Sequence, residues 1–414
     1  MNTETIITPK PILIPKDNID FARWSVIACD QFTSQPKYWE ELKNYVGDKP
    51  STLKLILPEV YLGGNMSDKI VKINAEMQKY IDDNIFKVIQ SGMILVERST
   101  PYSKKRLGLV VAVDLEKYSF NVSENSLIRA SERTILERIP PRVKIREKAP
   151  LELPHTMLLL SDPDFTVIES AYKSEEKELI YDFELNQGGG HIKGYEVKNP
   201  QKVLESFKKI STLEAMQKTC KSCEVFCLAV GDGNHSLATA KVNWNNIKRE
   251  LPESERENHP ARFALVEIAN LYNEGLNFHP IHRVIKNIDI KKVLSALKNE
   301  FLIEKGITEV IFNSNETLNM HIPSDPMDAI EGVQKFLDDL KLEDESIIID
   351  YVHGDDNLRE IVSSVPDSLG IKLPPIQKEN FFEALAARKV LPKKSFSIGE
   401  ATEKRYYLEA KYIK

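Results

Sequence analysis

The order of the apolar segments predicts an α/β protein, with an α+β arrangement left open. Short apolar runs such as 93–96 and 107–113 alternate with stretches of helical periodicity such as 68–90. Such alternation favours a sheet covered by helices over a helical bundle. The chain has 414 residues, more than the roughly 250–300 at which one hydrophobic core usually stops growing. We therefore expect a core built on a mixed sheet and a second, smaller α/β subdomain.

The N-terminal part of the chain is expected to contain both element types. The expected strands are 53–57, 93–96 and 107–113, and the expected helices are 36–43, 68–90 and 125–138. Ser67 or Asp68 is a suitable N-cap for the second helix. Pro140 and Pro141 are expected to end the third helix and to keep the following segment extended.

The middle of the chain continues the alternation. The expected strands are 166–168, 179–185, 225–230 and 261–268, and the expected helices are 199–216 and 237–248. Three consecutive glycines, Gly188 to Gly190, interrupt this pattern. Because such a run favours no regular element, we expect a mobile loop or a site of close backbone approach there.

The C-terminal part has fewer chemically suggestive clusters and reads as a subdomain. Its expected helices are 290–301, 326–340 and 381–387, and its expected strands are 310–313, 346–351 and 406–410. We expect a core domain over 1–289, an α/β subdomain over 290–378, and a segment over 379–414 that returns to the core.

Charge and hydropathy restrict the classes of partner. The formal net charge is −6, so no basic field covers the surface, and nucleic acid is not the expected partner. Residues 1–16 lack the apolar stretch of a signal peptide, and no run approaches the roughly 20 apolar residues that span a bilayer. We expect a cytoplasmic protein whose partner is a small molecule rather than a membrane. A homodimer is compatible with the sequence.

Three of the four cysteines cluster at 220, 223 and 227, a pattern that could hold a metal. Cys227 lies in the apolar run 225–230, however, where a cysteine acts as a small hydrophobic residue. No second Cys/His pair stands at zinc-finger spacing. We therefore assign no metal ligands.

The strongest chemical candidate joins the strand 225–230 to a helix. It consists of Gly231, Asp232, Gly233, Asn234, His235 and Ser236. Glycines allow a ligand to approach the backbone, and the start of a helix favours an anion. Asp232 could then remove a proton or hold a metal ion, and His235 could contact phosphate or shuttle a proton. The alternative is a glycine turn in which Asp232 or Asn234 only caps the helix, and for a short loop that alternative is common.

The loop matches neither of the two best-known nucleotide motifs. A G-x-x-x-x-G-K-[ST] loop needs a lysine on the phosphates, and none follows here. The spacing of a G-x-G-x-x-G fingerprint is also absent. P-loop and Rossmann assignments are therefore excluded.

A second candidate is a group of arginines. Arg129 and Arg133 are four residues apart and would share one face of the expected helix 125–138. A guanidinium fork suits phosphate or carboxylate. The alternative is a solvated helix face with Glu132 and Glu137 as partners. Further arginines follow at Arg138, Arg142 and Arg146.

Two shorter motifs complete the candidates. In His279-Pro280-Ile281-His282-Arg283 the proline argues for an extended segment, so a two-histidine metal site is not expected. We expect one of the two histidines, His279 or His282, or Arg283 to face the 231–236 loop instead. Asp30 follows an apolar run and could face a cleft or merely begin a turn. No His or Lys stands near Cys29 in sequence to activate its thiol.

Five motifs that occur in order resemble a known family. They are Arg-Trp-Ser-Val-Ile-Ala-Cys-Asp-Gln-Phe at 23–32, Ala-Ser-Glu-Arg-Thr at 130–134, Gly-Asp-Gly-Asn-His-Ser at 231–236, His-Pro-Ile-His-Arg at 279–283 and Leu-Pro-Lys-Lys-Ser at 391–395. Together they resemble the domain-of-unknown-function family one-thousand-and-fifteen over nearly the whole chain. The commoner branch of that family has Ala-Asp-Gly-His-His-Arg-Tyr in place of the third motif.

That commoner loop is similar to the Asp-Gly-His-His-Arg loop of ParB/sulfiredoxin-like proteins, which include nucleotide-dependent free-serine kinases. The resemblance implies a catalytic role for Asp232, with Gly233, Asn234 and His235 at the matching Gly-His-His positions. Ser236 stands where the arginine would be. Its loss removes a bidentate phosphate contact, which Arg133 or Arg283 would have to replace.

These observations lead to three hypotheses. The first is a phosphotransferase that acts on a small amino or hydroxy acid, serine or phosphoserine, with ATP or ADP and Mg²⁺ as cofactors. Asp232, His235 and Asp30 would be its catalytic residues. Phosphate or substrate would contact Gly231, Gly233, Asn234, Ser236, Arg129, Arg133, His282 and Arg283. The second is a non-enzymatic sensor of a nucleotide or metabolite, and the third is a metal-dependent hydrolase. The first predicts that the motifs share one cleft.

Overall fold

The computed structural model describes residues 6–33, 35–63, 65–174, 176–301, 303–313 and 316–414. The chain divides into two compact units. The large unit comprises Met1–Leu276 and Gly399–Lys414, and the small unit comprises Asn277–Ile398. These divisions differ from the expected boundaries after 289 and 378. Residues 281–286 form a strand that pairs on both sides with strands of the small unit's sheet, so they belong to the small unit.

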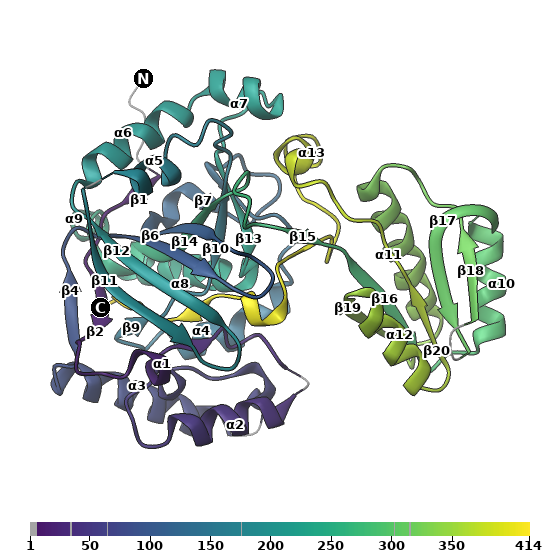
Figure 1. Ribbon diagram of the computed structural model, residues 1–414, viewed down its shortest axis with the longest axis horizontal. Coiled ribbons are helices and arrows are strands. Elements are labelled where there is room, and N and C mark those ends of the chain that lie inside the picture. The colour runs from purple at the N-terminus through teal and green to yellow at the C-terminus, as the bar shows by residue number, and fades with distance from the viewer. Residues whose placement is uncertain (1–5, 34, 64, 175, 302, 314–315) are drawn as a thin grey trace. The chain divides into compact units, whose positions relative to one another are not determined.

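A ten-stranded mixed sheet forms the framework of the large unit (Figure 1). Its order is β11 (Lys177–Leu185), β12 (Gly190–Val197), β5 (Met93–Ser99), β6 (Arg106–Asp114), β14 (Phe263–Asn270), β10 (Met157–Leu160), β13 (Leu228–Asp232), β8 (Ile128–Arg129) and β7 (Tyr118–Ser119), with β1 (Ile7–Thr8) paired to β6. The pairs β10–β14, β13–β8 and β7–β8 are parallel and the others antiparallel. The expected mixed-sheet α/β class is therefore confirmed.

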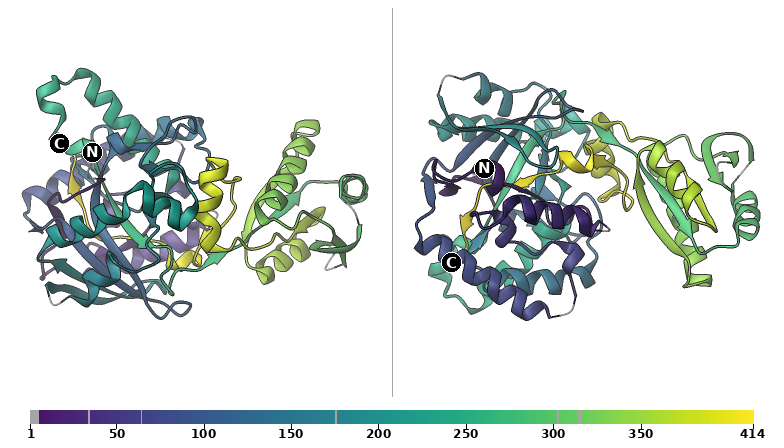
Figure 2. Two further views of the ribbon diagram at one scale, coloured as in Figure 1. Left: turned by 90° about the horizontal axis from the view of Figure 1, so that it is seen from above. Right: turned by 60° about the horizontal axis from the view of Figure 1, so that its bottom comes forward.

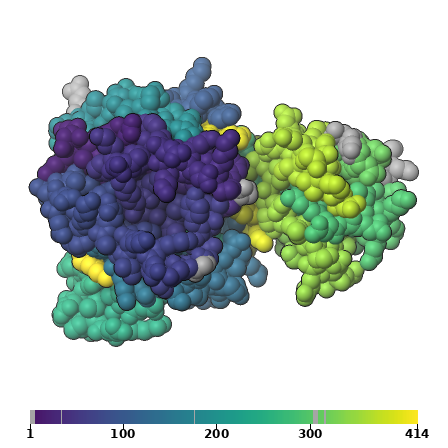
Figure 3. Space-filling view, turned by 90° about the horizontal axis from the view of Figure 1, so that it is seen from below, coloured from purple at the N-terminus to yellow at the C-terminus, as the bar shows by residue number. Residues whose placement is uncertain are grey.

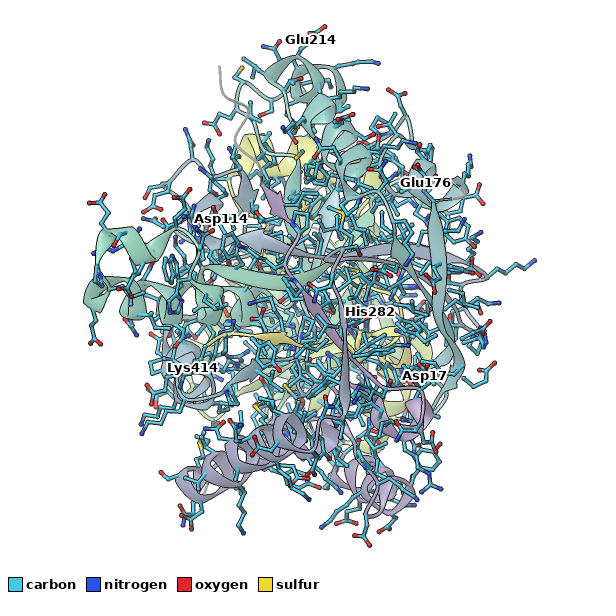
Figure 4. All side chains as sticks on the ribbon, turned by 90° about the vertical axis from the view of Figure 1, so that its left-hand side faces the viewer. Asp17, Asp114, Glu176, Glu214, His282 and Lys414 are labelled. Atoms are coloured by element: carbon cyan, nitrogen blue, oxygen red, sulfur yellow. The ribbon has the colours of Figure 1, made fainter. Side chains whose placement is uncertain are left out.

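The central strands are buried along their whole length, which explains their sequences. All residues of β6 and β14 are buried. A strand covered on both faces reads as a continuous apolar run rather than an alternating one, as the expected strands 107–113 and 261–268 do. Asp114, labelled in Figure 4, ends β6. It accepts two hydrogen bonds from Arg262, at 2.9 and 2.6 Å.

Helices cover the large unit. The longer ones are α2 (Pro36–Val46), α3 (Met66–Asp82), α6 (Pro200–Ile210), α7 (Leu213–Cys220) and α8 (Asn234–Glu250). Trp39 of α2 and Met77 of α3 belong to the main apolar core, together with Trp24. Figure 3 shows that the N-terminal segment, coloured purple to blue, forms most of one face of this unit. No helix in the described part of the chain is long and apolar enough to cross a bilayer.

The last sixteen residues run back into the large unit (Figure 2). Strand β22 (Tyr406–Tyr407) pairs with β3 (Val26–Ile27), and β23 (Lys411–Tyr412) pairs with β9 (Leu151–Glu152). Tyr406, Tyr407, Leu408, Ala410 and Ile413 are part of the main core. This C-terminal segment is therefore an integral piece of the large unit.

Buried charges attach the C-terminal segment to the sheet. Arg405 forms ion pairs with Glu267 of β14 and with Glu409. Arg106 of β6 also approaches Glu267, at 3.8 Å. Tyr181 of β11 donates a hydrogen bond of 2.7 Å to Glu409. Each of these charges has an opposite partner, which offsets much of the cost of burying it.

The small unit contains a five-stranded antiparallel sheet with three longer helices and a further helix, α13 (Phe381–Arg388). The sheet order is β18 (Glu316–Met320), β17 (Ile303–Phe312), β20 (Ser368–Ile371), β16 (Ile281–Lys286) and β19 (Ile348–His353), and the longer helices are α10 (Ile290–Glu300), α11 (Pro326–Glu343) and α12 (Asp355–Ser364). Leu358 and Val362 of α12 pack against Val284 and Ile311 of the sheet. The expected helices 290–301, 326–340 and 381–387 are confirmed.

The expected helix 125–138 is wrong. Residues Ile128–Arg129 form strand β8, and only Leu136–Arg138 form a short 3-10 turn. Ile128 is buried and β8 pairs with both β13 and β7. Sheet hydrogen bonds and burial therefore override the local helical periodicity. Arg129 and Arg133 consequently do not share a helix face.

The expectation for Pro140 and Pro141 is also wrong. Both lie in α4 (Ile139–Arg146), near its start. The first turn of a helix has no intrahelical partner for its N–H groups, so prolines are tolerated there. Arg142 and Arg146 thus lie on a helix, where they pair with Glu59 and Glu152.

Two short expected strands are also wrong. Residues Thr52–Lys54, at the start of 53–57, form a 3-10 turn capped by Ser51. At 166–168 the chain turns into α5 (Ile168–Lys173), because the Asp162 carboxylate accepts hydrogen bonds from Thr166 and Val167. Apolar runs of three to five residues do not distinguish a strand from a buried turn.

The glycines at 188–190 form the tight turn between β11 and β12. Gly190 has a φ of +80°, and a Cβ there would lie 2.1 Å from the carbonyl oxygen of Ser99. Gly188 has a similar φ of +75°, but a Cβ there would meet nothing within 4 Å. Close backbone approach, one of the two alternatives expected from sequence, is therefore what Gly190 provides.

Gly190→Ala is expected to lower the free energy of unfolding substantially more than Gly188→Ala. Both variants pay for a left-handed alanine, about 1–2 kcal/mol, but only Gly190→Ala also pushes a methyl group into the Ser99 carbonyl. Urea denaturation of the two variants measures the difference. Equal losses of stability would show that the contact with Ser99 has no energetic weight.

His282 is expected to make the small unit less stable at acid pH. Its Nδ1 accepts the Leu373 N–H at 3.1 Å and its Nε2 contacts Asp355 at 2.9 Å, an arrangement that suits the neutral ring. Burial lowers the pKa of His282 below its ordinary value of 6.5, although Asp355 opposes the shift. A lowered histidine pKa contributes stability that is complete above pH 6.5 and is lost as the pH falls through the folded-state pKa.

Thermal unfolding between about pH 5 and 8 tests this expectation. The wild-type midpoint should fall on acidification, and His282→Gln should reduce that slope, whereas the control His279→Gln should keep it. An unchanged slope in His282→Gln would assign the pH dependence to other groups.

Candidate functional site

The loop at 231–236 is the joint between β13 and α8. Asp232 ends β13, Gly233 has a left-handed φ of 82°, and α8 begins at Asn234. A Cβ at Gly233 would lie 3.0 Å from Cα and Oγ1 of Thr156. Glycine is therefore required both by the left-handed backbone conformation and by the close approach of Thr156, the residue just before β10. The loop places a carboxylate beside the N-terminus of a 17-residue helix.

Contacts with Gly233 and Lys404 help to hold Asp232 in place. Its Oδ1 accepts the backbone N–H of Gly233 at 2.9 Å, and its Oδ2 lies 3.1 Å from Nζ of Lys404. The side chain of Asp232 is 31% exposed and that of Lys404 is 10% exposed. The partly exposed end of β13 therefore brings together the Lys404 ammonium group, the Asp232 carboxylate and the positive end of the α8 dipole.

Asn234 and His235 hold a neighbouring loop. The Asn234 side chain accepts the Ser131 N–H at 3.2 Å and donates to the Ser131 hydroxyl at 3.1 Å. His235 Nε2 accepts the Ile135 N–H at 3.3 Å. Because Nε2 is an acceptor, the neutral ring carries its proton on Nδ1. These contacts bring the exposed Arg133, in the loop 131–135, to the same region of the large unit.

Arg129 faces a different environment. Its guanidinium pairs with Glu224 and lies over the ring of Phe226, 3.8 Å from the centroid. Both partners precede β13, whereas Asp232 ends that strand. Arg129 is thus a buried structural residue, and the structure does not bring it together with the loop.

Asp30 belongs to a second polar cluster. Its Oδ2 lies 3.8 Å from His155 Nε2, and its Oδ1 accepts a hydrogen bond of 3.0 Å from Gln31. Tyr407 Oη lies 2.6 Å from His155 Nδ1 and donates to Cys29 Sγ at 3.0 Å. Burial raises the pKa of the Cys29 thiol to about 12, and the charge of Asp30 adds to the shift. The thiol is therefore not an activated nucleophile.

Three chain segments connect the two clusters. Met157, two residues after His155, is the ladder partner of Asp232. Lys404, which pairs with Asp232, is three residues before Tyr407, which contacts His155. Three residues of extended chain span roughly 10 Å. The Ala28 N–H also binds the Arg405 carbonyl at 2.9 Å, so all three segments run together.

The motif 279–283 lies in the small unit. Arg283 is fully buried and donates to Gln334 and to the carbonyl oxygens of Ile281, Lys393 and Lys394. His282 contacts Asp355 and Leu373. All of these partners belong to the small unit as well, so both side chains stabilise that unit. In the described residues, no group of three or more His, Cys, Asp or Glu is placed to hold a metal ion.

Sequence reasoning missed His155, Lys404 and Tyr407. Each is distant in sequence from the residue that it contacts, and none stands in a motif with recognisable spacing. The one available signal was the expected return of the C-terminal segment to the core. It gave no indication of which side chains the segment would present.

The chain is similar to several solved structures at low identity. It is 12% identical to a conserved hypothetical protein from Pyrococcus furiosus, with a TM-score of 0.37, over 70% of this chain and 90% of the other. A free serine kinase in complex with AMP is 10% identical, with a TM-score of 0.40, over 73% and 92%. SbnI with a C-terminal truncation from Staphylococcus aureus is 8% identical, with a TM-score of 0.39, over 73% and 87%.

No curated protein matches the chain. A family model described as protein of unknown function (DUF1015) matches residues 10–354. This range includes most of the large unit, with the 231–236 loop, Asp30 and His155, and more than half of the small unit, whereas Lys404 and Tyr407 lie beyond it. On this match, the chain belongs to the DUF1015 family.

Proposed function

We propose that the protein is a phosphotransferase that moves a phosphoryl group between a nucleotide and the hydroxyl group of a small amino or hydroxy acid. The observation that carries the proposal is the Asp232–Lys404 pair beside the N-terminus of α8. Phosphoryl transfer requires charge neutralisation and positioning more than covalent chemistry. A lysine, a helix N-terminus and a carboxylate at one place supply these functions.

The phosphate groups of the nucleotide would lie at the start of α8. Helix N-termini bind anions because their N–H groups and dipole point toward the ligand. Lys404 would add a positive charge, and the exposed Arg133 in the neighbouring loop could replace the arginine whose position Ser236 occupies. Gly231 and Gly233 would let the phosphates approach the backbone.

Asp232 would supply the carboxylate that holds a metal ion near the phosphate groups of the nucleotide. Mg²⁺ binds proteins through one or two carboxylates, with water and substrate phosphates as its other ligands. Asp232 is one partly exposed carboxylate next to the proposed phosphate position, so its donor set fits a Mg²⁺ ion that arrives with the nucleotide. Such an ion would neutralise charge on the phosphates, and Lys404 would orient the carboxylate.

The acceptor would lie between Asp232 and Asp30. The connecting segments keep the backbones of the two clusters within roughly 10 Å of each other, a distance that a molecule the size of serine can bridge with its carboxylate, amino and hydroxyl groups. Asp30 is 29% exposed and would attract a cationic amino group. Serine and phosphoserine are therefore the first acceptors and donors to test.

The experiment follows phosphorus by ³¹P NMR in mixtures of the protein, Mg²⁺, serine or phosphoserine, and each of ATP, ADP and AMP. A new phosphoester or nucleotide resonance that grows with time is the expected result. Flat spectra with every pair of a broad panel of hydroxy and amino acids would overturn the proposal.

A nucleotide or metabolite sensor is the second candidate, and one observation favours it. Asn234 and His235 use side-chain atoms to fix the loop 131–135, and Ser236 provides no guanidinium. A site built in this way can bind an anion without accelerating a reaction. Tight binding of ATP or ADP by calorimetry, together with flat ³¹P spectra, would identify the sensor.

A further inference from the structure

The cluster of Cys29, Tyr407, His155 and Asp30 has a hydrogen-bond pattern that can set the tautomer of an imidazole. Tyr407 Oη lies within hydrogen-bond distance of three groups: His155 Nδ1 at 2.6 Å, Cys29 Sγ at 3.0 Å and the Cys29 N–H at 3.3 Å. Burial raises the pKa of Tyr407 well above 10, so the phenol keeps its single proton. That proton can point toward only one acceptor at a time.

The two positions of this proton define two states of His155. When Tyr407 donates to Nδ1, the neutral ring carries its own proton on Nε2 and Nε2 cannot accept another. When Tyr407 donates to Cys29 Sγ instead, over 3.0 Å, the His155 Nδ1–H donates to the phenol oxygen. Nε2 then carries a lone pair.

The Nε2 edge of His155 faces Asp30, and neither side chain is fully buried. Nε2 lies 3.8 Å from Asp30 Oδ2, and the His155 and Asp30 side chains are 12% and 29% exposed. A carboxylate at this distance would stabilise an imidazolium. Glu59 and Arg142 also influence this cluster electrostatically through Cys29, and they pair with each other.

We propose that His155 is the general base for the acceptor hydroxyl and that Tyr407 and Cys29 are positioning residues that hold its ring in the Nδ1–H tautomer. This inference rests on the proposed phosphotransferase function. As the hydroxyl oxygen forms its bond to phosphorus, its proton passes to His155 Nε2. The bond from the terminal phosphorus to the bridging oxygen of the nucleoside triphosphate breaks, and the nucleoside diphosphate leaves with the electron pair. Asp30 then faces the imidazolium, and no further co-reactant is needed.

The activity test uses the full-length protein with ATP, Mg²⁺ and the acceptor that wild type phosphorylates. His155→Gln should lower kcat by about 10²- to 10⁴-fold, the range for loss of a general base, while the Kd for ADP stays within about twofold of wild type, since the phosphate end of the site is untouched. A His155→Gln variant with wild-type kcat would overturn the inference and leave the proposed function standing. A wild type without turnover would overturn both.

The positioning roles have their own test, with a conservative rescue. Cys29→Ala removes the acceptor for the Tyr407 proton, so the proton should turn to Nδ1 and kcat should fall by roughly tenfold or more. Cys29→Ser supplies another acceptor and should restore most of the rate. Equal activity of the two variants, or equal loss in both, would contradict the role given to Cys29.

The tautomer can be observed without any turnover. In ¹⁵N-labelled wild type, the His155 ring, identified by its absence from the His155→Gln spectrum, should show the pattern of an Nδ1–H imidazole. Tyr407→Phe should change that pattern while the protein stays folded, because only the hydroxyl is lost. An Nε2–H ring in wild type would overturn the inference whatever the activity assay shows.

Discussion

Asp232→Asn is expected to lower the rate of phosphoryl transfer by about two to three orders of magnitude, the usual cost of losing one electrostatic contact to the reacting group, while leaving the fold intact. Asparagine keeps the shape of the side chain and its hydrogen bond from the Gly233 N–H. It loses the negative charge that pairs with Lys404 and that would bind Mg²⁺ on the nucleotide. The measurement is the initial rate of phosphoester formation followed by ³¹P NMR.

The control for this variant is a second aspartate–lysine pair. Asp17 pairs with Lys87 at an exposed position of the large unit (Figure 4), so Asp17→Asn should keep the wild-type rate. Lys404→Met should also slow transfer, and the double variant of Asp232 and Lys404 should lose less than the product of the single effects, because the two residues act as a unit. A wild-type rate in Asp232→Asn would remove Asp232 from the reaction.

Glu267→Ala is expected to produce the largest loss of stability, about 3–5 kcal/mol, the usual cost of removing one partner of a buried ion pair. Glu267 and Arg405 have side chains that are each only 3% exposed. Without Glu267, Arg106 loses a nearby carboxylate and Arg405 retains only Glu409. The alanine would also leave a cavity beside Gly108, whose Cα lies against the Glu267 side chain.

Guanidinium denaturation measures this loss, and Glu267→Gln separates its two causes. Glutamine keeps most of the volume and removes only the charge, so it should be less destabilising than alanine but still clearly destabilising. Lys335→Ala, which breaks the exposed pair with Asp339, should have little effect. If Glu267→Ala unfolded at the wild-type midpoint, the buried network would not contribute to the attachment of the C-terminal segment.

The sequence predicts best those elements whose patterns are long. Strands β6 and β14 are continuous apolar runs because both of their faces are covered. Helices α8, α10 and α11 have apolar residues at helical spacing over eleven or more residues. In each case the local pattern and the tertiary environment agree, so the pattern suffices.

Short elements were mispredicted because their partners decide their structure. Strand β8 consists of two residues between β13 and β7, and no window around Arg129 contains that information. The prolines at 140 and 141 show the same limitation, since proline stops a helix in its interior but is favoured at its start. The sequence alone could not place the helix start before them.

The candidate site shows a similar division. The loop at 231–236 can be recognised from sequence because glycines permit its backbone conformation and polar residues cap the helix that follows it. Lys404 and Tyr407 have no such local signal, because the pairing of β22 with β3 brings them to the site from the far end of the chain. Pairings of this kind are properties of the tertiary structure, and residue spacing does not record them.

The origin of Lys404 and Tyr407 has a consequence for biosynthesis. The ribosome makes the chain from the N-terminus at roughly 5–20 residues per second, so His155 and Asp232 emerge long before Tyr407 and Lys404, which pair with them. The 122 residues from Asn277 to Ile398 are translated between β14 and the segment that completes the large unit. Both clusters therefore remain incomplete in the nascent chain while the whole small unit is synthesised. Neither cluster can form until Lys404 and Tyr407 have left the exit tunnel.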